Sequence, residues 1–227
     1  MINFYETIDK KFLDPSPPNP NFDLHGFKLP FRACVVAPSG SGKTNMITGL
    51  IHLFCKGKGS FNTITVICRD ATEPLYRHLA SKSDSIMIRE GLENLPVLDK
   101  FEKEHSSLVI IDDMVLDKNQ SRICEYYIRC RKRNVSIMYL SQSYFMIPKI
   151  IRNNCNYLIL LKMSGDREVN LIMKESGLGL SKQQLLGLYE FATDTKFSPL
   201  IINIEETDKQ KKFRKGFTEF INPDDFK

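Results

Sequence analysis

A glycine- and serine-rich segment that ends in lysine and threonine is the strongest chemical signal in the sequence. Residues 37–44 read Ala37-Pro-Ser-Gly-Ser-Gly-Lys-Thr44 and match the phosphate-loop pattern G-x-x-x-x-G-K-[ST] at every fixed place except the first, where Ala37 replaces glycine. An apolar stretch precedes the segment and a helix-compatible stretch follows it, which is the context that the pattern requires. The segment therefore predicts a nucleotide-binding loop. The alternative is an ordinary Gly/Ser-rich turn.

The residue types of this loop suit a triphosphate. Gly40 and Gly42 let the backbone curl so that successive N–H groups point at a phosphate, and the start of the following helix adds its positive dipole end. Lys43 is expected to reach the β- and γ-phosphates of ATP, and the Thr44 hydroxyl is expected to take one place on Mg²⁺. The expected nucleotide-binding residues are Pro38, Ser39, Gly40, Ser41, Gly42, Lys43, Thr44 and Asn45.

A second run, at residues 107–114, has four apolar residues followed by Asp112 and Asp113. A buried strand of this kind delivers its carboxylates to its C-terminal end, beside the phosphate loop. Asp112 is expected to hold Mg²⁺ through its water shell. Asp113 stands where many phosphate-loop ATPases carry a glutamate that orients and deprotonates the attacking water, and is one methylene shorter. Asp-Asp is also common in turns, but its place after a phosphate loop favours the catalytic interpretation.

A third apolar run, at residues 134–143, ends in polar residues, among which Gln142 is expected to contact the γ-phosphate or to position water. Arg129, Arg131 and Arg133 come just before this run. An arginine finger supplied to a neighbouring subunit fits this place, and Arg131 is the favoured residue. The alternatives are a solvated helix end and contact with nucleic-acid phosphates.

These motifs together resemble the genome-packaging ATPases of large DNA viruses and virophages, the poxvirus-type branch of the FtsK–HerA superfamily. The resemblance is carried by residues 37–44, 108–113 and especially 131–145, with 147–154 adding to it, and it covers about residues 30–165. It implies a RecA-like ATPase in a homo-oligomeric ring, a pentamer or hexamer, that moves double-stranded DNA into a preformed capsid. A capsid or portal-vertex protein is then a further partner, and the location is the host-cell cytoplasm at the viral assembly site, or the virion.

The resemblance also implies roles for individual residues. The phosphate-loop residues bind ATP, the two acidic residues bind Mg²⁺ and activate water, the glutamine acts as a sensor, and an arginine acts across the subunit interface. The matching positions are Lys43, Thr44, Asp112, Asp113, Gln142 and Arg131.

Short apolar runs alternate with longer amphipathic stretches, which predicts an α/β fold. We expect a three-layer P-loop NTPase of the RecA-like, additional-strand type, with a mainly parallel central sheet. Several apolar runs are continuous, as in strands that are buried on both faces. The expected strands are 33–37, 63–68, 85–88, 108–111, 136–140, 157–161 and 199–204. The expected helices are 43–54, 73–79, 97–104, 120–131, 149–152, 167–175 and 182–191.

The chain of 227 residues suits one globular domain with flanking segments. Residues 14–21 contain four prolines, so we expect a Pro-rich N-terminal arm over 1–30 and a folded core that begins near Phe31. The ATPase domain is expected over 31–206. Residues 207–227 are expected to form a basic C-terminal tail, flexible unless it docks on a partner.

Composition narrows the function classes. The net charge of +5 permits a nucleic-acid partner without requiring one. Six scattered cysteines without a C-x-x-C pair favour a reducing, intracellular compartment, and apolar runs far shorter than about 18 residues predict no membrane span. Two alternative functions remain. A small P-loop kinase would need an acceptor pocket and an arginine-rich lid, and a non-motor scaffold would bind ATP without DNA-stimulated turnover.

Overall fold

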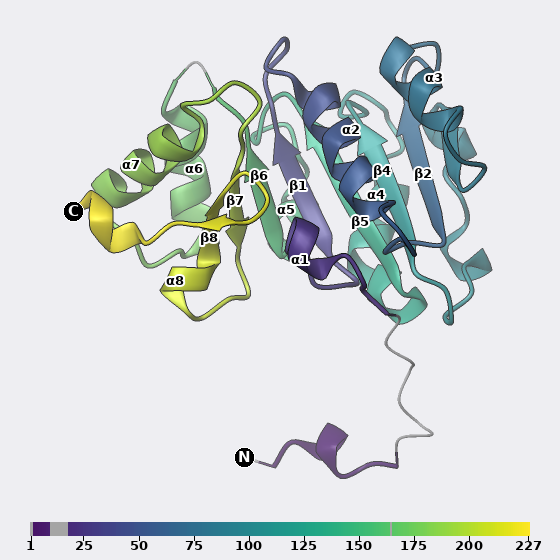
Figure 1. The fold of residues 1–227 in the computed structure, drawn as a ribbon, viewed down its shortest axis with the longest axis horizontal. Helices are drawn as coiled ribbons and strands as arrows, with labels where there is room; N and C mark the ends of the chain where they lie inside the picture. Colours follow the sequence, from purple (N-terminus) through teal and green to yellow (C-terminus); the bar gives the residue numbers. More distant parts are fainter. Residues whose placement is uncertain (1, 10–17, 164) are drawn as a thin grey trace.

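A nine-stranded sheet forms the centre of the protein, which is described here by a computed structural model covering residues 2–9, 18–163 and 165–227. The strand order is β3-β2-β4-β5-β1-β6-β7-β8-β9. Strands β3 to β6 in this order pair in parallel, and β7, β8 and β9 continue the sheet in antiparallel pairs (Figure 1). The strands are β1 (Arg32–Val36), β2 (Thr63–Cys68), β3 (Ile86–Glu90), β4 (Ser107–Asp112), β5 (Val135–Ser141), β6 (Tyr157–Leu160), β7 (Leu200–Asn203), β8 (Phe213–Lys215) and β9 (Glu219–Phe220).

Helices cover both faces of this sheet. Helices α1, α2 and α3 pack on one face, and α4, α5, α6 and α7 pack on the other (Figure 1). The helices are α1 (Phe22–His25), α2 (Lys43–Phe54), α3 (Pro74–Ala80), α4 (Gln120–Arg129), α5 (Lys149–Asn154), α6 (Arg167–Ser176), α7 (Lys182–Ala192) and α8 (Lys209–Lys212). Within the described ranges, every helix is too short or too polar to cross a lipid bilayer.

Side chains that alternate along the strands build two hydrophobic cores. In β1, Cys34 and Val36 join the core under α4 to α7, whereas Ala33 and Val35 join the core under α2 and α3. Both cores need apolar residues from the same strand, because successive side chains point to opposite faces. This is why the central strands read as continuous apolar runs, and the predicted three-layer fold is confirmed.

Strand β5 lies between β1, which leads into the phosphate loop, and β4, which ends in Asp112. This is the additional strand that the sequence predicted between the two motif-bearing strands. All seven expected strands are present, and six of the seven expected helices are present.

The helix expected over 97–104 is wrong. Only a 3₁₀ turn, Leu98–Lys100, forms there, and it ends at Phe101, whose backbone is extended. Leu98 is buried and Phe101, three residues later, packs against the same core. A single turn is enough to point both side chains into the core. The charged residues that follow make no apolar face for a longer helix.

The expected start of the fold near Phe31 is also too late. Asn21 is buried, and its side-chain amide donates to the backbone carbonyls of Phe54 and Lys56. The fully buried Phe27 packs its ring against Phe31 and Phe54. Residues 14–17 of the Pro-rich segment lie outside the described residues. Residues 2–9 lie apart from the folded body (Figure 1).

The C-terminal segment over 207–227 does not form a separate tail. Strand β8 pairs with β7, Phe213 is fully buried, and Arg214 is 2% exposed. The 3₁₀ turn Pro223–Phe226 packs against α7. The many lysines made this segment look solvent-exposed in the sequence, although a few apolar residues anchor it. The segment extends the sheet beyond its parallel part.

Candidate nucleotide-binding site

The phosphate loop connects the carboxyl end of β1 to the first turn of α2. Gly40 and Gly42 have φ values of 75° and 89°, in the left-handed region that glycine enters without strain. The Ser41 N–H and hydroxyl both donate to the Pro38 carbonyl, which closes the turn. Ala37 is fully buried and is not among the described residues with positive φ, so alanine is tolerated where the pattern has glycine.

A cavity of about 410 Å³ opens above this loop. Three side chains from other parts of the chain complete its wall: Leu75, Gln142 and Phe197. The loop contributes Ala37, Pro38, Ser39, Gly40, Gly42, Lys43, Thr44 and Asn45. The cavity therefore contains the expected nucleotide-binding residues except Ser41, together with the glutamine that ends the additional strand.

Lys43 and Asp112 form an ion pair at the floor of the site. The Lys43 Nζ lies 2.7 Å from Asp112 Oδ1, and both side chains are largely buried. The Tyr76 hydroxyl, from α3, donates to the other oxygen, Asp112 Oδ2, at 2.6 Å. Two donors from different elements thus fix the orientation of this carboxylate.

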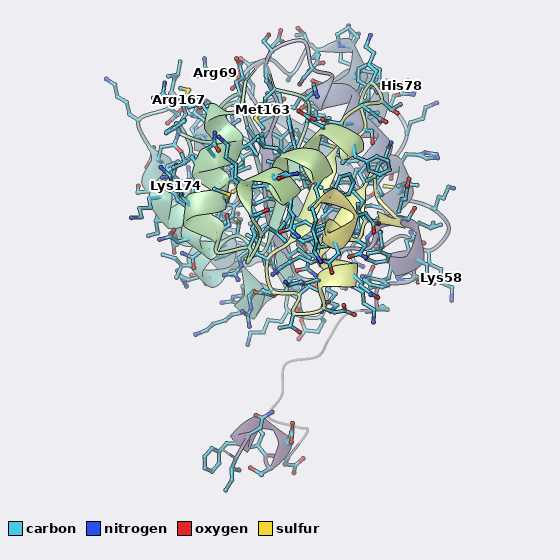
Figure 2. All side chains as sticks on the ribbon, turned by 90° about the vertical axis from the view of Figure 1, so that its left-hand side faces the viewer. Lys58, Arg69, His78, Met163, Arg167 and Lys174 are labelled. Atoms are coloured by element: carbon cyan, nitrogen blue, oxygen red, sulfur yellow. The ribbon has the colours of Figure 1, made fainter. Side chains whose placement is uncertain are left out.

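Asp113 and Gln142 meet beside this ion pair. The Gln142 Nε2 donates to Asp113 Oδ2 at 2.8 Å. Asp113 has a φ of 55°, and two backbone contacts hold it there: its N–H donates to the Leu140 carbonyl, and its own carbonyl accepts from Arg69 Nε at 2.9 Å. Arg69 follows β2 and is labelled near the top of the folded body in Figure 2, whereas Lys58 is labelled lower down on the opposite side.

Glu73 adds a third carboxylate close to the phosphate loop. It precedes α3 and is half-buried. Burial, and next the charge of Asp112, raises the pKa of Glu73, while a hydrogen bond with Thr44 and the charge of Lys43 oppose the rise. Glu73 is therefore within electrostatic reach of the residues that the sequence assigned to Mg²⁺.

The donor set fits a magnesium ion shared with a nucleotide. Asp112 Oδ1 is buried, and its contact is the ion pair with Lys43. In the part of the chain that the structure describes, no three His, Cys, Asp or Glu side chains are grouped to hold a metal by themselves. Mg²⁺ in phosphate-transfer sites takes one or two protein ligands and completes its octahedron with phosphate oxygens and waters. Thr44 and Asp112 are the residues that would hold it.

The three arginines before β5 differ in their contacts. Arg129 and Arg133 each have Nη2 at 3.1 Å from the same Asp99 oxygen, and Arg129 also pairs with Glu125. Arg131 is exposed, and its side chain makes no ion pair with any described residue.

Arg131 also lies far from the other predicted site residues of its own chain. It belongs to the 3₁₀ turn Cys130–Arg133, which leads into the amino end of β5, whereas Gln142 follows the carboxyl end of that strand. Strand β5 has seven residues, which span about 23 Å. The sequence-predicted residues Lys43, Asp112 and Gln142 come together in one site, and Arg131 does not join them.

Sequence motifs did not identify four residues of this site. Arg69, Glu73, Tyr76 and Phe197 lie in segments after β2 and before β7. Arg69 had one available signal, because polar residues directly after a buried strand share the sheet edge with the phosphate loop. The other three carry no local pattern.

A family model for the poxvirus A32 protein matches residues 22–211. The chain belongs to the poxvirus A32 family. This confirms the resemblance to viral genome-packaging ATPases that the motifs indicated. No curated protein matches the chain.

Solved structures support the same fold. The genome packaging NTPase B204 from Sulfolobus turreted icosahedral virus 2, in complex with ATP-gammaS, is 11% identical with a TM-score of 0.56, covering 81% of this chain and 95% of that one. The complex of that NTPase with sulfate gives 10% identity, a TM-score of 0.57, and coverage of 79% and 94%. EssC from Geobacillus thermodenitrificans is 11% identical with a TM-score of 0.56, covering 85% of this chain and 40% of that one. These similarities establish a phosphate-loop NTPase fold.

Proposed function

We propose that this chain hydrolyses ATP and couples hydrolysis to the movement of double-stranded DNA into a viral capsid. The observation that carries the proposal is the convergence of Lys43, Asp112, Asp113 and Gln142 at the carboxyl ends of three adjacent strands. Family membership supports packaging as the process, since the chain belongs with poxvirus A32 proteins. B204, which has the same fold, is a packaging NTPase that binds an ATP analogue.

The first task of the site is to hold the triphosphate. The backbone N–H groups of residues 40–44 and the amino end of α2 provide positive potential at the loop. Lys43 donates to the β- and γ-phosphates, exchanging its contact with Asp112 for the nucleotide. Thr44 and Asp112 would hold Mg²⁺, which would neutralise charge on the phosphates.

The second task is to position the attacking water. Gln142 donates to Asp113 Oδ2, which leaves Asp113 Oδ1 as the acceptor for a water proton. The two backbone contacts of Asp113 keep this carboxylate at the carboxyl edge of the sheet, so that the water is aligned with the γ-phosphate.

Arg131 acts on a neighbouring subunit rather than on its own. The length of β5 separates Arg131 from the phosphate loop of its own chain, and the ion pairs of Arg129 and Arg133 with Asp99 make those two less available. A guanidinium supplied in trans stabilises the charge of the transition state and makes turnover depend on assembly. A homo-oligomeric ring, pentamer or hexamer, provides such an arrangement.

DNA is contacted through its phosphates, so base sequence is not recognised. The net charge of +5 supports this mode of binding, which weakens with salt. A capsid or portal-vertex protein completes the proposed assembly, in a reducing host-cell cytoplasm at the site of virion formation.

ATP hydrolysis by the purified chain, with and without double-stranded DNA and across protein concentration, tests the proposal. Lys43→Ala and Arg131→Ala should each abolish turnover, and mixing the two variants should restore part of it. A mixed ring then pairs an intact phosphate loop with an intact arginine. Lys132→Ala is the matched control, because Lys132 is an exposed cation in the same turn. ATP binding with turnover that stays flat at every DNA and protein concentration would contradict the motor and favour a scaffold.

A further inference from the structure

Phe197 has an unusual backbone conformation at the edge of the phosphate-loop cavity. Its φ of 69° lies in the left-handed region, which a bulky side chain rarely enters. The residue is 37% exposed and lines the cavity above the loop. Strained residues with exposed side chains persist where the surrounding structure holds them, and they concentrate at ligand sites.

The Phe197 ring is packed directly on the phosphate loop. A Cβ placed on Gly42 would lie 2.0 Å from Phe197 Cδ1 and 2.2 Å from Cε1. With the ring in this position, any side chain at position 42 would collide with it. The conformation of the loop and the position of this aromatic ring are therefore matched to each other.

The order of the strands places Phe197 on the nucleoside side of the loop. The hydrolytic residues Asp112, Asp113 and Gln142 follow β4 and β5, on one side of β1. Phe197 precedes β7, on the other side of β1, and β7 is antiparallel to β6, so its amino end lies at the same sheet edge as the phosphate loop. A triphosphate bound with its γ-phosphate at the carboxylates would therefore extend its nucleoside toward the side of β1 on which Phe197 lies.

A second cavity, of about 370 Å³, adjoins the first on this side. Gly40 and Phe197 line both cavities. The remaining wall includes Ser41 of the loop, Lys162 after β6, and Thr193 and Thr195 before β7. Aromatic rings beside such a cavity offer a flat apolar surface, and hydroxyl and ammonium groups offer polar contacts.

We propose that Phe197 is the stacking surface for the base of the bound nucleotide, and that the second cavity receives this base. The proposal rests on the proposed ATP site: the phosphate loop binds the triphosphate, and Phe197 adds a contact for the nucleoside. The ligand class is a nucleoside triphosphate, and stacking alone accepts any base because every base has an aromatic face.

Binding of ATP and of inorganic tripolyphosphate to the full chain separates the base from the phosphates. Phe197→Ala should weaken ATP binding roughly 5- to 150-fold, the range for loss of one base–aromatic stack, and leave tripolyphosphate binding unchanged. Phe197→Tyr keeps the ring and should keep the affinity. Phe191→Ala is the control, because Phe191 has a similar exposure of 39% and lines neither cavity.

A direct optical test is available because the sequence contains no tryptophan. Phe197→Trp introduces a single indole, whose fluorescence should be quenched by ATP and not by tripolyphosphate. Phe191→Trp should respond to neither ligand. Phe197→Trp keeps an aromatic ring at the loop. It therefore tests stacking even if the Phe197→Ala variant does not fold.

The outcomes distinguish the two proposals. If the wild-type chain binds ATP but Phe197→Ala weakens ATP and tripolyphosphate equally, or neither, the stacking assignment is wrong and the phosphate site stands. If the wild-type chain binds no ATP, the proposed function fails and the stacking assignment fails with it.

Discussion

Replacing Tyr76 with phenylalanine removes the hydroxyl that contacts Asp112 at the end of β4. The hydroxyl donates to Asp112 Oδ2 at 2.6 Å. Both residues are buried, with Tyr76 1% exposed and Asp112 7% exposed. Burial, and next the charge of Asp112, raises the pKa of Tyr76, so the hydroxyl stays protonated and remains a donor. The variant leaves the carboxylate with one buried oxygen that has lost its donor.

The expected loss of stability follows from the charge of the acceptor. A hydrogen bond to a charged group contributes about 1.5–3 kcal/mol, which in a protein of this size corresponds to a fall of roughly 3–12 °C in melting temperature. The same hydroxyl orients a residue proposed to hold Mg²⁺. Loss of such a supporting contact typically weakens metal affinity or activity by about 10- to 100-fold. We therefore expect the Mg²⁺ concentration at half-maximal ATPase activity to rise by that factor.

Tyr126→Phe is the matched control. Its hydroxyl donates at the same distance of 2.6 Å, but to the neutral Pro96 carbonyl and on the other face of the sheet. This variant should lose only about 0.5–1.5 kcal/mol and should keep the wild-type Mg²⁺ dependence. Thermal melts and Mg²⁺ titrations of both variants measure the difference. If Tyr76→Phe behaves like Tyr126→Phe in both measurements, the positioning role of Tyr76 is refuted.

Three further predictions concern a carboxylate and two glycines at the site, and a buried histidine at the other end of α2. Burial raises the pKa of Glu73, so ionisation of this carboxyl destabilises the folded state. The Glu73→Gln variant should therefore become more stable relative to the wild type as pH rises through that pKa. A stability difference that stays constant with pH in urea melts would contradict this. Gly40→Ala should cost about 1–2 kcal/mol for its left-handed φ alone, and Gly42→Ala more, because its Cβ also meets the Phe197 ring; equal costs in urea unfolding would refute the contact. Burial, and next the charge of Arg214, lowers the pKa of His25 to about 4. As pH falls, the unfolded chain therefore binds a proton at His25 before the folded chain does. The free energy of unfolding should fall by about 3 kcal/mol between pH 6.5 and pH 4. His25→Gln should remove that slope from a pH series of urea melts, and an unchanged slope would assign it to other groups.

Local pattern was sufficient for most of the nucleotide site. The spacing of Gly42, Lys43 and Thr44 defines the loop, and apolar runs that end in Asp112 and Gln142 define two strands whose carboxyl ends face it. Parallel pairing then brings these ends to one edge, whichever side chains fill the rest of the sheet. This is why the additional-strand topology follows from motifs that are far apart in the chain, whereas the hydrogen bond of Gln142 with Asp113 is seen only in the structure.

The flanking segments were harder to interpret, because charge conceals burial in short elements. Four of the six residues 209–214 are cationic, yet Phe213 is fully buried and β8 pairs with β7. Arg214 is itself buried, with its guanidinium donating to the carbonyls of His25 and Phe217. A basic composition therefore predicts a solvated segment reliably only where no neighbouring strand is available to pair with it.

The sequence by itself determined the phosphate loop, the two acidic positions, the glutamine and the α/β class, because each depends on residues that are adjacent in the chain or on a strand period. Only the tertiary structure decided that Tyr76 supports Asp112, that Glu73 approaches Thr44, and that the Phe197 ring rests on Gly42. These contacts join segments far apart in the chain, and their geometry depends on how helices and loops pack on the finished sheet. No local pattern encodes such a meeting, because each partner would look like an ordinary surface or core residue in its own segment.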